Sequence, residues 1–509
     1  NLKIPAVMHI DSKACHAAAD AAASKLETRL FIDGAYVDAA DGDRFTVINP
    51  ATGAPVAEMH AGNEKDIDRA VAAALKAFKS GVWSKMEPRT RMEVLYRFAD
   101  LVEANTHELA VLDTLAMGKP ISDMLETDVP AVAQCIRFMA ECIDKIDGRV
   151  TNTAADVMHF VIREPYGVVG AISPWNYPML MAAWQFAPAL AAGNSVVLNP
   201  AEEAPLSCIR LAELFVEAGG PAGVFNVVNG IGEVAGQALA RHNDVAKISF
   251  TGSTEVGKLM LVYAGQSNMK RVSLECGGKS PQIFMADLGD LDAAVEAAIG
   301  GIFSNMGEVC SASSRLLVDR KIHDDFIAKF RASGEAAFTP GDPLDPDTTM
   351  GPLVTKQAQS RVLTYIDKGK KEGATLAFGG AVPPGLESGA FVSPTLFTDV
   401  ANTMTIAREE IFGPVASVIP FDGVEEALAI ANDTIYVLGA GVWTRDLDTA
   451  MRMVKGLESG RVWVNTYDAG DMTQPFGGVK QSGNAKDNCM DSVKSYLQEK
   501  SAWIQLSDD

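Results

Sequence analysis

Short runs rich in β-branched residues recur from Gly167 onward, and each is separated from the next by a segment with helical patterning. The runs cover residues 168–172, 195–198, 224–228, 247–251 and 272–275. Their spacing of roughly 25 residues fits successive βαβ units, because parallel neighbouring strands need a crossover long enough to contain a helix. We therefore predict an α/β fold with a parallel sheet covered by helices on both faces.

A second α/β pattern follows after Asp287. Its predicted strands cover residues 316–318, 417–420, 441–444 and 462–465, and the junction between the two patterns lies beside Gly277 and Gly278. A chain of 509 residues exceeds the length that one hydrophobic core usually serves. We expect at least two domains, with mainly helical structure between residues 64 and 146.

Residues 1–60 have the pattern of an arm. An alanine-rich stretch, 17–23, predicts a helix, and residues 31–37 predict a hairpin that turns at Asp33 and Gly34. Asp-Gly favours the tight turns that join two antiparallel strands.

Charge and composition exclude several classes of protein. The formal net charge of −21 disfavours nucleic acid, because a binder must neutralise phosphates with clustered Lys and Arg. No apolar stretch is long enough to span a membrane, and the longest, residues 179–192, predicts a buried helix. Seven cysteines without a CxxC pair, and no secretory signal pattern at the first residues, favour a reducing, cytoplasmic location. No metal site is predicted.

Two glycine-containing turns are candidate phosphate sites. Residues 250–258 follow a predicted strand and open a helix, so the N–H groups near Gly252 and Ser253 are available to an anion. This turn nearly matches a nucleoside triphosphate loop, but Leu259 stands where a magnesium-binding Ser or Thr is required. The second turn, 230–236, includes Gly232. An ordinary strand-to-helix turn remains the alternative interpretation for this second turn.

Cys310 differs from the other cysteines, which are expected to be inert. It lies in a loop of small residues after a predicted helix, 291–303, where a thiol can face a cleft and backbone N–H groups can face an oxyanion. The nearby Glu308 would raise the pKa of the thiol if its carboxylate pointed inward.

Six separated segments resemble the aldehyde dehydrogenase superfamily, in the family's order. They are residues 174–178 (PWNYP), 250–258 (FTGSTEVGK), 274–281 (LECGGKSP), 305–315 (NMGEVCSASSR), 409–414 (EEIFGP) and 475–483 (PFGGVKQSG). The resemblance covers nearly the whole chain. Residues 467–472 (YDAGDM) resemble the branch that acts on γ-glutamyl-γ-aminobutyraldehyde and related, betaine aldehyde-like amino aldehydes. The resemblance implies an NAD(P)-dependent enzyme that oxidises an amino or aliphatic aldehyde to its carboxylate.

The resemblance assigns catalytic roles to three residues. Cys310 would attack the aldehyde carbon, and the Asn176 side chain and the Cys310 backbone N–H would stabilise the oxyanion. Hydride transfer to the nicotinamide would leave a thioester on the sulfur. Glu275 would then activate the water that hydrolyses this thioester, a task that suits a carboxylate whose pKa is raised by burial.

The resemblance also implies the residues that bind the cofactor. Glu410 would bind the nicotinamide ribose and Phe412 would lie beside the nicotinamide ring. The remaining predicted contacts are Trp175, Gly252 and Ser253 near the pyrophosphate, Glu202 and Asn199 near the adenosine ribose, and Gly232 in the second glycine turn.

Asn199 departs from the family pattern, because a lysine is usual at its position. Losing that cation removes a contact to the adenosine ribose and a partner for a 2′-phosphate, and Glu202 would repel such a phosphate. Both effects favour NAD over NADP, although the first leaves the strength of NAD binding open.

The predicted substrate pocket contains Tyr177, Trp184 and Asp471. Gly470 stands where a bulky aromatic residue often narrows the tunnel in relatives that prefer small aliphatic aldehydes. Asp471 would attract a cationic substrate if it faced the tunnel, and it is a solvated loop carboxylate otherwise.

By resemblance the fold has three parts: a Rossmann-like NAD-binding domain (1–147 and 166–277), a catalytic α/β domain (278–484) and a small β oligomerisation arm (148–165 and 485–509). The alternating pattern of residues 157–163 suits a strand of that arm. In the family the arm joins homodimers or homotetramers, and the sequence does not choose between them.

Two other functions remain open. One is a CoA-acylating semialdehyde dehydrogenase, although relatives of that kind generally lack the base at the position of Glu275. The other is a non-catalytic structural derivative of the same fold, against which Cys310, Glu275 and Asn176 argue.

Overall fold

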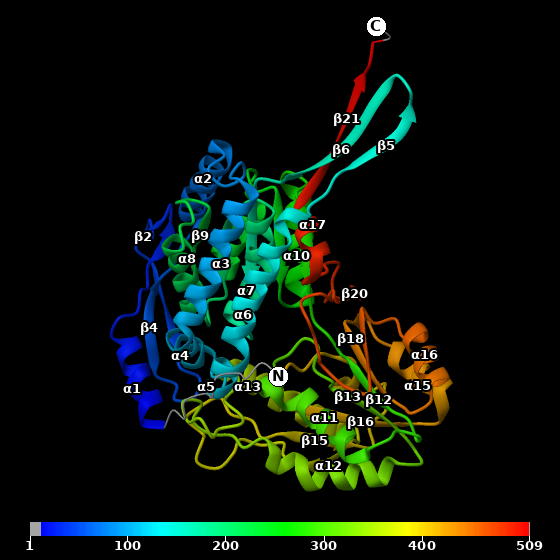
Figure 1. Cartoon of the computed structure of the whole chain (residues 1–509). Coiled ribbons are helices and arrows are strands. Elements are labelled where there is room, and N and C mark those ends of the chain that lie inside the picture. The colour runs from blue at the N-terminus through cyan, green and yellow to red at the C-terminus, as the bar shows by residue number, and fades with distance from the viewer. Residues whose placement is uncertain (1–11, 508–509) are drawn as a thin grey trace.

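A computed structural model describes residues 12–507 of the chain (Figure 1). Two seven-stranded sheets form the body of the molecule. The first has the order β11-β10-β7-β8-β9-β1-β2 and the second the order β14-β15-β16-β13-β12-β18-β19. The α/β fold class with parallel sheets is confirmed.

The first sheet contains all five strands predicted after Gly167, at nearly the predicted bounds. They are β7 (Val168–Ser173), β8 (Ser195–Pro200), β9 (Phe225–Val227), β10 (Lys247–Thr251) and β11 (Arg271–Glu275), and they pair in parallel. Successive residues such as Val196 and Val197 point to opposite faces, and both are fully buried. Helices cover both faces of such a sheet, which explains why its strands are apolar without alternation.

Helices pack on the two faces of the first sheet. On one side are α7 (Pro178–Ala191), α6 (Val129–Glu141), α3 (Pro88–Ala104), α4 (Thr106–Met117) and α8 (Leu206–Glu217), and on the other α2 (Glu64–Ser80), α9 (Gln237–Arg241) and α10 (Thr254–Gln266). The predicted buried helix at 179–192 is α7. A π-helical turn, η1 (Met124–Asp128), follows α5 (Ile121–Asp123) and leads into α6.

The predicted arm at residues 1–60 is wrong for the described part, 12–60. The hairpin β1 (Leu30–Ile32) and β2 (Ala35–Val37) exists, and Asp33 and Gly34 turn it with φ of 54° and 78°. However, β1 pairs with β9 and extends the first sheet. A second hairpin, β3 (Arg44–Ile48) and β4 (Pro55–His60), follows, and α1 (Ser12–Ala23) packs against α4.

The second sheet follows the Gly277-Gly278 junction. Its strands are β12 (Pro281–Phe284), β13 (Arg315–Asp319), β14 (Thr375–Phe378), β15 (Thr395–Thr398), β16 (Val415–Phe421), β18 (Gly439–Trp443) and β19 (Arg461–Val464). Only β14 pairs antiparallel. Its helices are α11 (Leu291–Phe303), α12 (His323–Ala337), α13 (Lys356–Lys371), α14 (Thr405–Arg408), α15 (Gly423–Asn432) and α16 (Leu447–Gly456).

A three-stranded antiparallel sheet projects from the body and ends near the C-terminus (Figure 1). It consists of β5 (Arg149–Ala154), β6 (Val157–Pro165) and β21 (Leu497–Gln505), and α17 (Cys489–Ser495) connects β21 to the body. The strand predicted at 157–163 is β6. A separate two-stranded sheet pairs β17 (Tyr436–Val437) with β20 (Val479–Lys480).

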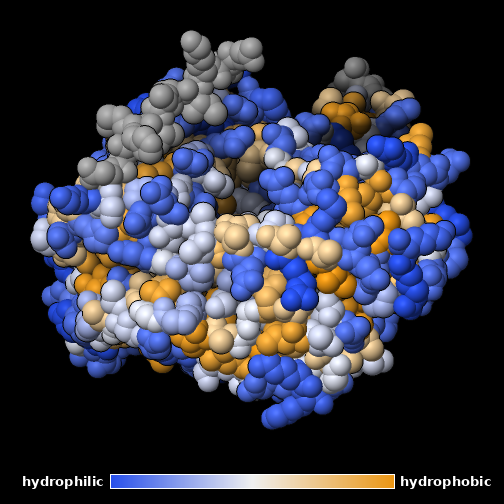
Figure 2. Space-filling view, turned by 90° about the horizontal axis from the view of Figure 1, so that it is seen from below, coloured by the Kyte–Doolittle hydropathy of each residue, from blue (hydrophilic) through white to orange (hydrophobic). Residues whose placement is uncertain are grey.

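No helix within residues 12–507 is both long enough and apolar enough to cross a membrane. The face shown in Figure 2 carries hydrophilic and hydrophobic side chains next to one another, and a recess opens toward its upper edge.

Candidate active site

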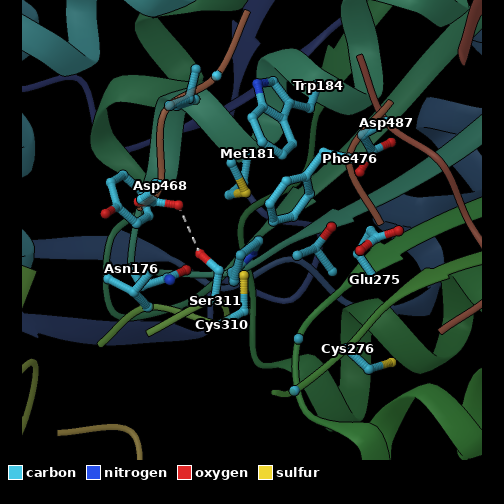
Figure 3. Close-up of a pocket in the computed structure, with 18 of the residues that line it drawn as sticks. Asn176, Met181, Trp184, Glu275, Cys276, Cys310, Ser311, Asp468, Phe476 and Asp487 are labelled. Atoms are coloured by element: carbon cyan, nitrogen blue, oxygen red, sulfur yellow. Dashed lines mark hydrogen bonds between the residues drawn. The ribbon is translucent and has the colours of Figure 1, made fainter. Parts of the chain in front are cut away.

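A cavity of about 470 Å³ collects side chains from the loops that follow the strands of both sheets (Figure 3). Eleven of the fourteen predicted site residues line it: Cys310, Glu275, Asn176, Trp175, Gly252, Ser253, Glu410, Phe412, Tyr177, Trp184 and Asp471. These residues come from six separate segments of the chain, so only the fold brings them together.

Cys310 lies in a loop with an unusual backbone. Asn305, Met306 and Gly307 all have positive φ, at 48°, 57° and 71°, at the end of the short 3-10 helix η4 (Ser304–Gly307). A Cβ on Gly307 would lie 2.3 Å from the carbonyl oxygen of Gly413, and one on Gly278 would lie 2.0 Å from that of Cys310. The loop therefore packs backbone to backbone against its neighbours, and this close packing holds Cys310 at the cavity wall.

Asn176 is fixed beside the same loop. Its amide nitrogen donates a hydrogen bond to the backbone carbonyl of Glu308 at 2.8 Å. The Asn305 amide in turn donates to the carbonyls of Asn176 and Glu308, at 3.0 and 3.2 Å. An amide group has two N–H donors, so one N–H of Asn176 remains for an oxygen atom in the cavity.

Glu308 does not face the thiol. Its side chain is fully buried, and one carboxyl oxygen accepts a hydrogen bond from the Val354 backbone N–H at 3.1 Å. Burial raises the pKa of Glu308 well above its ordinary value, which favours the uncharged acid. Burial, followed by the charges of Glu275 and Glu410, raises the pKa of Cys310.

Glu275 ends β11 and has the environment of a general base. Only 4% of the residue is exposed, and neither carboxyl oxygen has a hydrogen-bond partner among residues 12–507. Burial, followed by the charge of Asp487, raises the pKa of Glu275 well above its ordinary value. The positive charge of Lys486 lowers the pKa of Glu275. A Cβ on Gly477 would lie 2.4 Å from the Glu275 carboxyl, so a glycine is required beside it.

Glu410 lies against the glycine pair that joins the two sheets. Its carboxylate accepts a hydrogen bond from the Gly278 backbone N–H at 2.8 Å, and a Cβ on Gly277 would lie 2.2 Å from it. Burial raises the pKa of Glu410 to about 7. The Phe412 and Trp175 rings meet edge to face nearby, with centroids 5.4 Å apart. A carboxylate and two rings thus line the same side of the cavity.

The first glycine turn brings a helix N-terminus to the cavity. Thr251, Gly252 and Ser253 line the wall, and Ser253 caps α10 by accepting a hydrogen bond from the Val256 N–H at 3.2 Å. The free N–H groups and the positive end of the helix dipole favour an anionic ligand at this point.

Comparison with known proteins agrees with this arrangement. Residues 36–502 match the model of the aldehyde dehydrogenase family. The chain belongs to the aldehyde dehydrogenase family. The NADP/NAD-dependent aldehyde dehydrogenase PuuC of Escherichia coli (strain K12) is 49% identical over 481 residues, which cover 94% of this chain and 96% of PuuC.

Solved structures share the fold of this aldehyde dehydrogenase. An indole-3-acetaldehyde dehydrogenase complexed with NAD+ superposes with a TM-score of 0.96 and is 49% identical, covering 97% of this chain and 100% of its own. The γ-glutamyl-γ-aminobutyraldehyde dehydrogenase of Burkholderia cenocepacia J2315 has a TM-score of 0.94 and 51% identity, with the same coverage.

Three predicted cofactor residues of this aldehyde dehydrogenase lie outside the cavity. Glu202 and Gly232 are close together, because a Cβ on Gly232 would lie 3.8 Å from the Glu202 carboxylate. Asn199 is 2% exposed, and its amide nitrogen donates to the Val228 carbonyl at 2.9 Å. The Asn199 side chain therefore joins β8 to the end of β9, and the structure lends no support to its predicted contact with a cofactor.

The residues predicted for the substrate side differ in their exposure to solvent. Tyr177 and Trp184 form part of the wall, and the Trp184 ring meets the Phe476 ring edge to face at 5.2 Å. Asp471 is exposed at the edge of the cavity, where its carboxylate accepts hydrogen bonds from the backbone N–H and hydroxyl of Thr473 at 2.8 and 2.5 Å. Asp471 thus has the character of a solvated loop carboxylate.

Several lining residues of this aldehyde dehydrogenase were not predicted from the sequence. They include Ser311, Arg361, Arg461, Asp468, Phe476 and Asp487. Asp468 lies three residues before Asp471, and its carboxylate accepts a hydrogen bond from the Ser311 hydroxyl at 3.2 Å (Figure 3). The position of Ser311 directly after the nucleophile candidate was the one local signal that pointed to this pair.

Proposed function

We propose that this aldehyde dehydrogenase oxidises an amino or aliphatic aldehyde to its carboxylate with NAD as the hydride acceptor, through a thioester on Cys310. The observation that carries the proposal is the joint placement of Cys310, Asn176 and Glu275 in one cavity beside Glu410. PuuC and the structural neighbours, whose names include amino aldehydes and NAD+, support both the substrate class and the cofactor.

The side chains on the first-sheet side of the cavity fit a dinucleotide. The capped N-terminus of α10, with Gly252 and Ser253, suits a pyrophosphate, and Trp175 lies beside it. The carboxylates of Glu202 and Glu410 are suited to accept hydrogen bonds from ribose hydroxyls. When bound, NAD supplies the acceptor for the hydride that leaves the substrate carbon.

Cys310 and Asn176 act on the aldehyde. As a thiolate, Cys310 attacks the carbonyl carbon, and the carbonyl oxygen gains negative charge. The free N–H of the Asn176 amide and the backbone N–H of Cys310 stabilise that charge, because both are fixed before the reaction begins. After oxidation the acyl group remains on the sulfur as a thioester.

Glu275 completes the cycle by accepting a proton from a water molecule, which attacks the thioester and releases the carboxylic acid. Its buried, unpaired carboxyl group suits this role, because a base with a raised pKa takes a proton readily near neutral pH. Gly477 leaves room for this side chain, and Gly277 leaves room for Glu410.

The two sheets correspond to the two large domains of the proposal. We assign residues 1–147 and 166–277 to the NAD-binding domain, 278–484 to the catalytic domain and 148–165 with 485–509 to an oligomerisation arm. The arm exposes Val150 and Trp503, at 77% and 61%. Apolar side chains this exposed favour a homodimer or homotetramer in which another copy covers them.

The proposal is tested by following NADH formation with a panel of amino and aliphatic aldehydes. In Glu275→Gln we expect a burst of NADH with slow turnover afterwards, because acylation survives and hydrolysis does not. Free acid should be the product when CoA is present. Acyl-CoA as the main product would instead establish the CoA-acylating alternative, and failure to bind NAD would establish a non-catalytic protein.

A further inference from the structure

Ser311, the residue after Cys310, is held at two of its atoms by two consecutive residues. Its hydroxyl donates a hydrogen bond to the Asp468 carboxylate at 3.2 Å, drawn as the dashed line in Figure 3. Its backbone carbonyl accepts a hydrogen bond from the Tyr467 hydroxyl at 2.6 Å. Ser311 itself is 3% exposed. Both its side chain and its peptide group are therefore tied to the segment that follows β19.

That segment is itself firmly anchored. The Tyr467 ring packs against the Trp463 ring with centroids 4.8 Å apart. Cβ atoms on Gly301 of α11 and Gly441 of β18 would lie 2.9 and 2.6 Å from the Tyr467 ring, so the ring fills the space that these glycines leave. The Trp463 indole N–H donates to the Ala469 carbonyl at 2.6 Å. The Tyr467 ring and the Ala469 carbonyl, on either side of the exposed Asp468, are thus held against the second sheet.

Holding Ser311 in place affects the nucleophile directly. Burial, then the carboxylates of Glu275, Glu410 and Asp468, raises the pKa of Cys310, and the Ser311 backbone N–H lowers it. The orientation of the peptide between Cys310 and Ser311 therefore decides whether that N–H points at the thiolate. A small error in the position of a reacting atom is costly, because reaction requires close, aligned approach.

We propose that Tyr467 and Asp468 are positioning residues that, through Ser311, hold the Cys310 sulfur in the orientation needed to attack an aldehyde. The inference rests on the proposed role of Cys310 as nucleophile. The segment that holds Ser311 also lines the substrate side of the cavity, through residues that follow Asp468, including Gly470 and Met472. A displacement of that segment would therefore also displace the Cys310 sulfur, because Ser311 connects the two.

The test compares the purified full-length variants Ser311→Ala, Asp468→Asn, Tyr467→Phe and the double variant Ser311→Ala/Asp468→Asn. Two matched controls remove similar groups far from the cavity. Asp287→Asn alters a carboxylate that accepts a hydroxyl hydrogen bond, from Thr444 at 2.8 Å. Tyr263→Phe removes a hydroxyl that donates to Gln237 at 2.9 Å.

For each protein, kcat and KM are measured with one amino and one uncharged aldehyde, and alkylation of Cys310 by iodoacetamide is followed by mass spectrometry.

We expect Ser311→Ala and Asp468→Asn each to lower kcat roughly tenfold with both aldehydes, with little change in KM, and to slow alkylation of Cys310. The double variant should be no worse than either single one, because both act through the same hydrogen bond. Tyr467→Phe should act in the same direction, and the controls should match the unaltered protein. Removing the Asp468 charge alone would lower the thiol pKa and speed alkylation, so slower alkylation identifies positioning.

Three results would overturn the inference. They are faster alkylation with unchanged kcat, additive losses in the double variant, and a loss confined to the amino aldehyde, which would make Asp468 a substrate-binding residue. If Tyr467→Phe does not fold, the isosteric Asp468→Asn and the small change Ser311→Ala still decide. If the unaltered protein oxidises no aldehyde, the proposed function fails. The alkylation rates then still test whether Tyr467 and Asp468 position the Cys310 sulfur.

Discussion

The reactive side chains of this cavity are acids and a thiol whose neutral forms are favoured by burial. Burial raises the pKa of Glu275 well above its ordinary value, and it also raises that of Cys310. In the proposed mechanism both groups react in their deprotonated forms, so the active fraction of each grows as the pH rises. We therefore expect the burial that raises the pKa of Glu275 also to slow the reaction in acid.

Because both pKa values are raised, we predict that kcat rises as the pH is raised through neutrality, by up to about tenfold per pH unit where one group limits the rate. Steady-state NADH formation measures this profile, and the pre-steady-state burst separates acylation from hydrolysis. In Glu275→Gln the rise in the hydrolysis rate should disappear while that of the burst remains. A hydrolysis rate that falls with pH, or that keeps its profile in the variant, would contradict the assignment of Glu275.

Selectivity between NAD and NADP depends on carboxylates around the second glycine turn. Burial, then the charge of Glu202, raises the pKa of Glu203 to about 7, and Glu233 acts on both. No lysine stands at position 199 to neutralise a 2′-phosphate.

We predict a KM for NADP roughly 100-fold above that for NAD. In Glu202→Gln we expect this ratio of KM values to fall roughly tenfold. Initial rates with both cofactors measure this, and equal preference in the unaltered protein would disprove it.

At the residue scale the sequence predicted which motif residues line the cavity better than it predicted the contacts of neighbouring side chains. Cys310, Glu275 and Asn176 stand in motifs that specify them, and all three line the cavity. Asp468 was missed although it lies three residues before Asp471. Which of two nearby carboxylates meets Ser311 depends on the Tyr467 ring fitting beside Gly301 and Gly441, contacts between segments far apart in the sequence.

At the scale of elements, most buried parallel strands were predictable, whereas the strands of the projecting sheet were predicted only in part, β6 from its alternating pattern and β21 not at all. The strands β7 to β11 carry dense β-branched runs because both of their faces are covered. By contrast β21 is exposed over most of its length, so it has no apolar pattern to recognise. The strand β12 has four residues, all buried, too short a run to separate from the glycine-rich turn before it.

The turn η4 shows how an element is shaped for the site, and it gives a prediction about stability. Gly307 has a φ of 71°, and a Cβ there would lie 2.3 Å from the Gly413 carbonyl oxygen. We predict that Gly307→Ala lowers the free energy of unfolding by about 2–4 kcal/mol and lowers kcat by displacing the Cys310 loop. Gly265→Ala is the control, because a Cβ there meets nothing within 4 Å in the exposed part of α10.

Denaturant unfolding followed by fluorescence gives both free energies. Gly265→Ala should leave stability unchanged or raise it by about 0.5–1 kcal/mol, since alanine favours the helix. Equal effects of the two substitutions would show that the left-handed backbone of the turn is not required.

At the scale of the whole molecule, the projecting sheet of β5, β6 and β21 gathers several exposed apolar side chains on one small element. Val150, Met158, Trp503 and Ile504 are exposed there at 77%, 49%, 61% and 44%.

We predict that Trp503→Asp shifts the assembly toward monomers, because a charge at an apolar interface loses contacts and must be desolvated, together costing about 2 kcal/mol or more per interface. The matched control is Leu447→Asp, which changes an equally apolar, 73% exposed residue of α16 outside the arm. Analytical ultracentrifugation over a range of concentrations measures the effect. An unchanged mass distribution in Trp503→Asp, or an equal shift in Leu447→Asp, would show that the arm is not the surface that joins the copies.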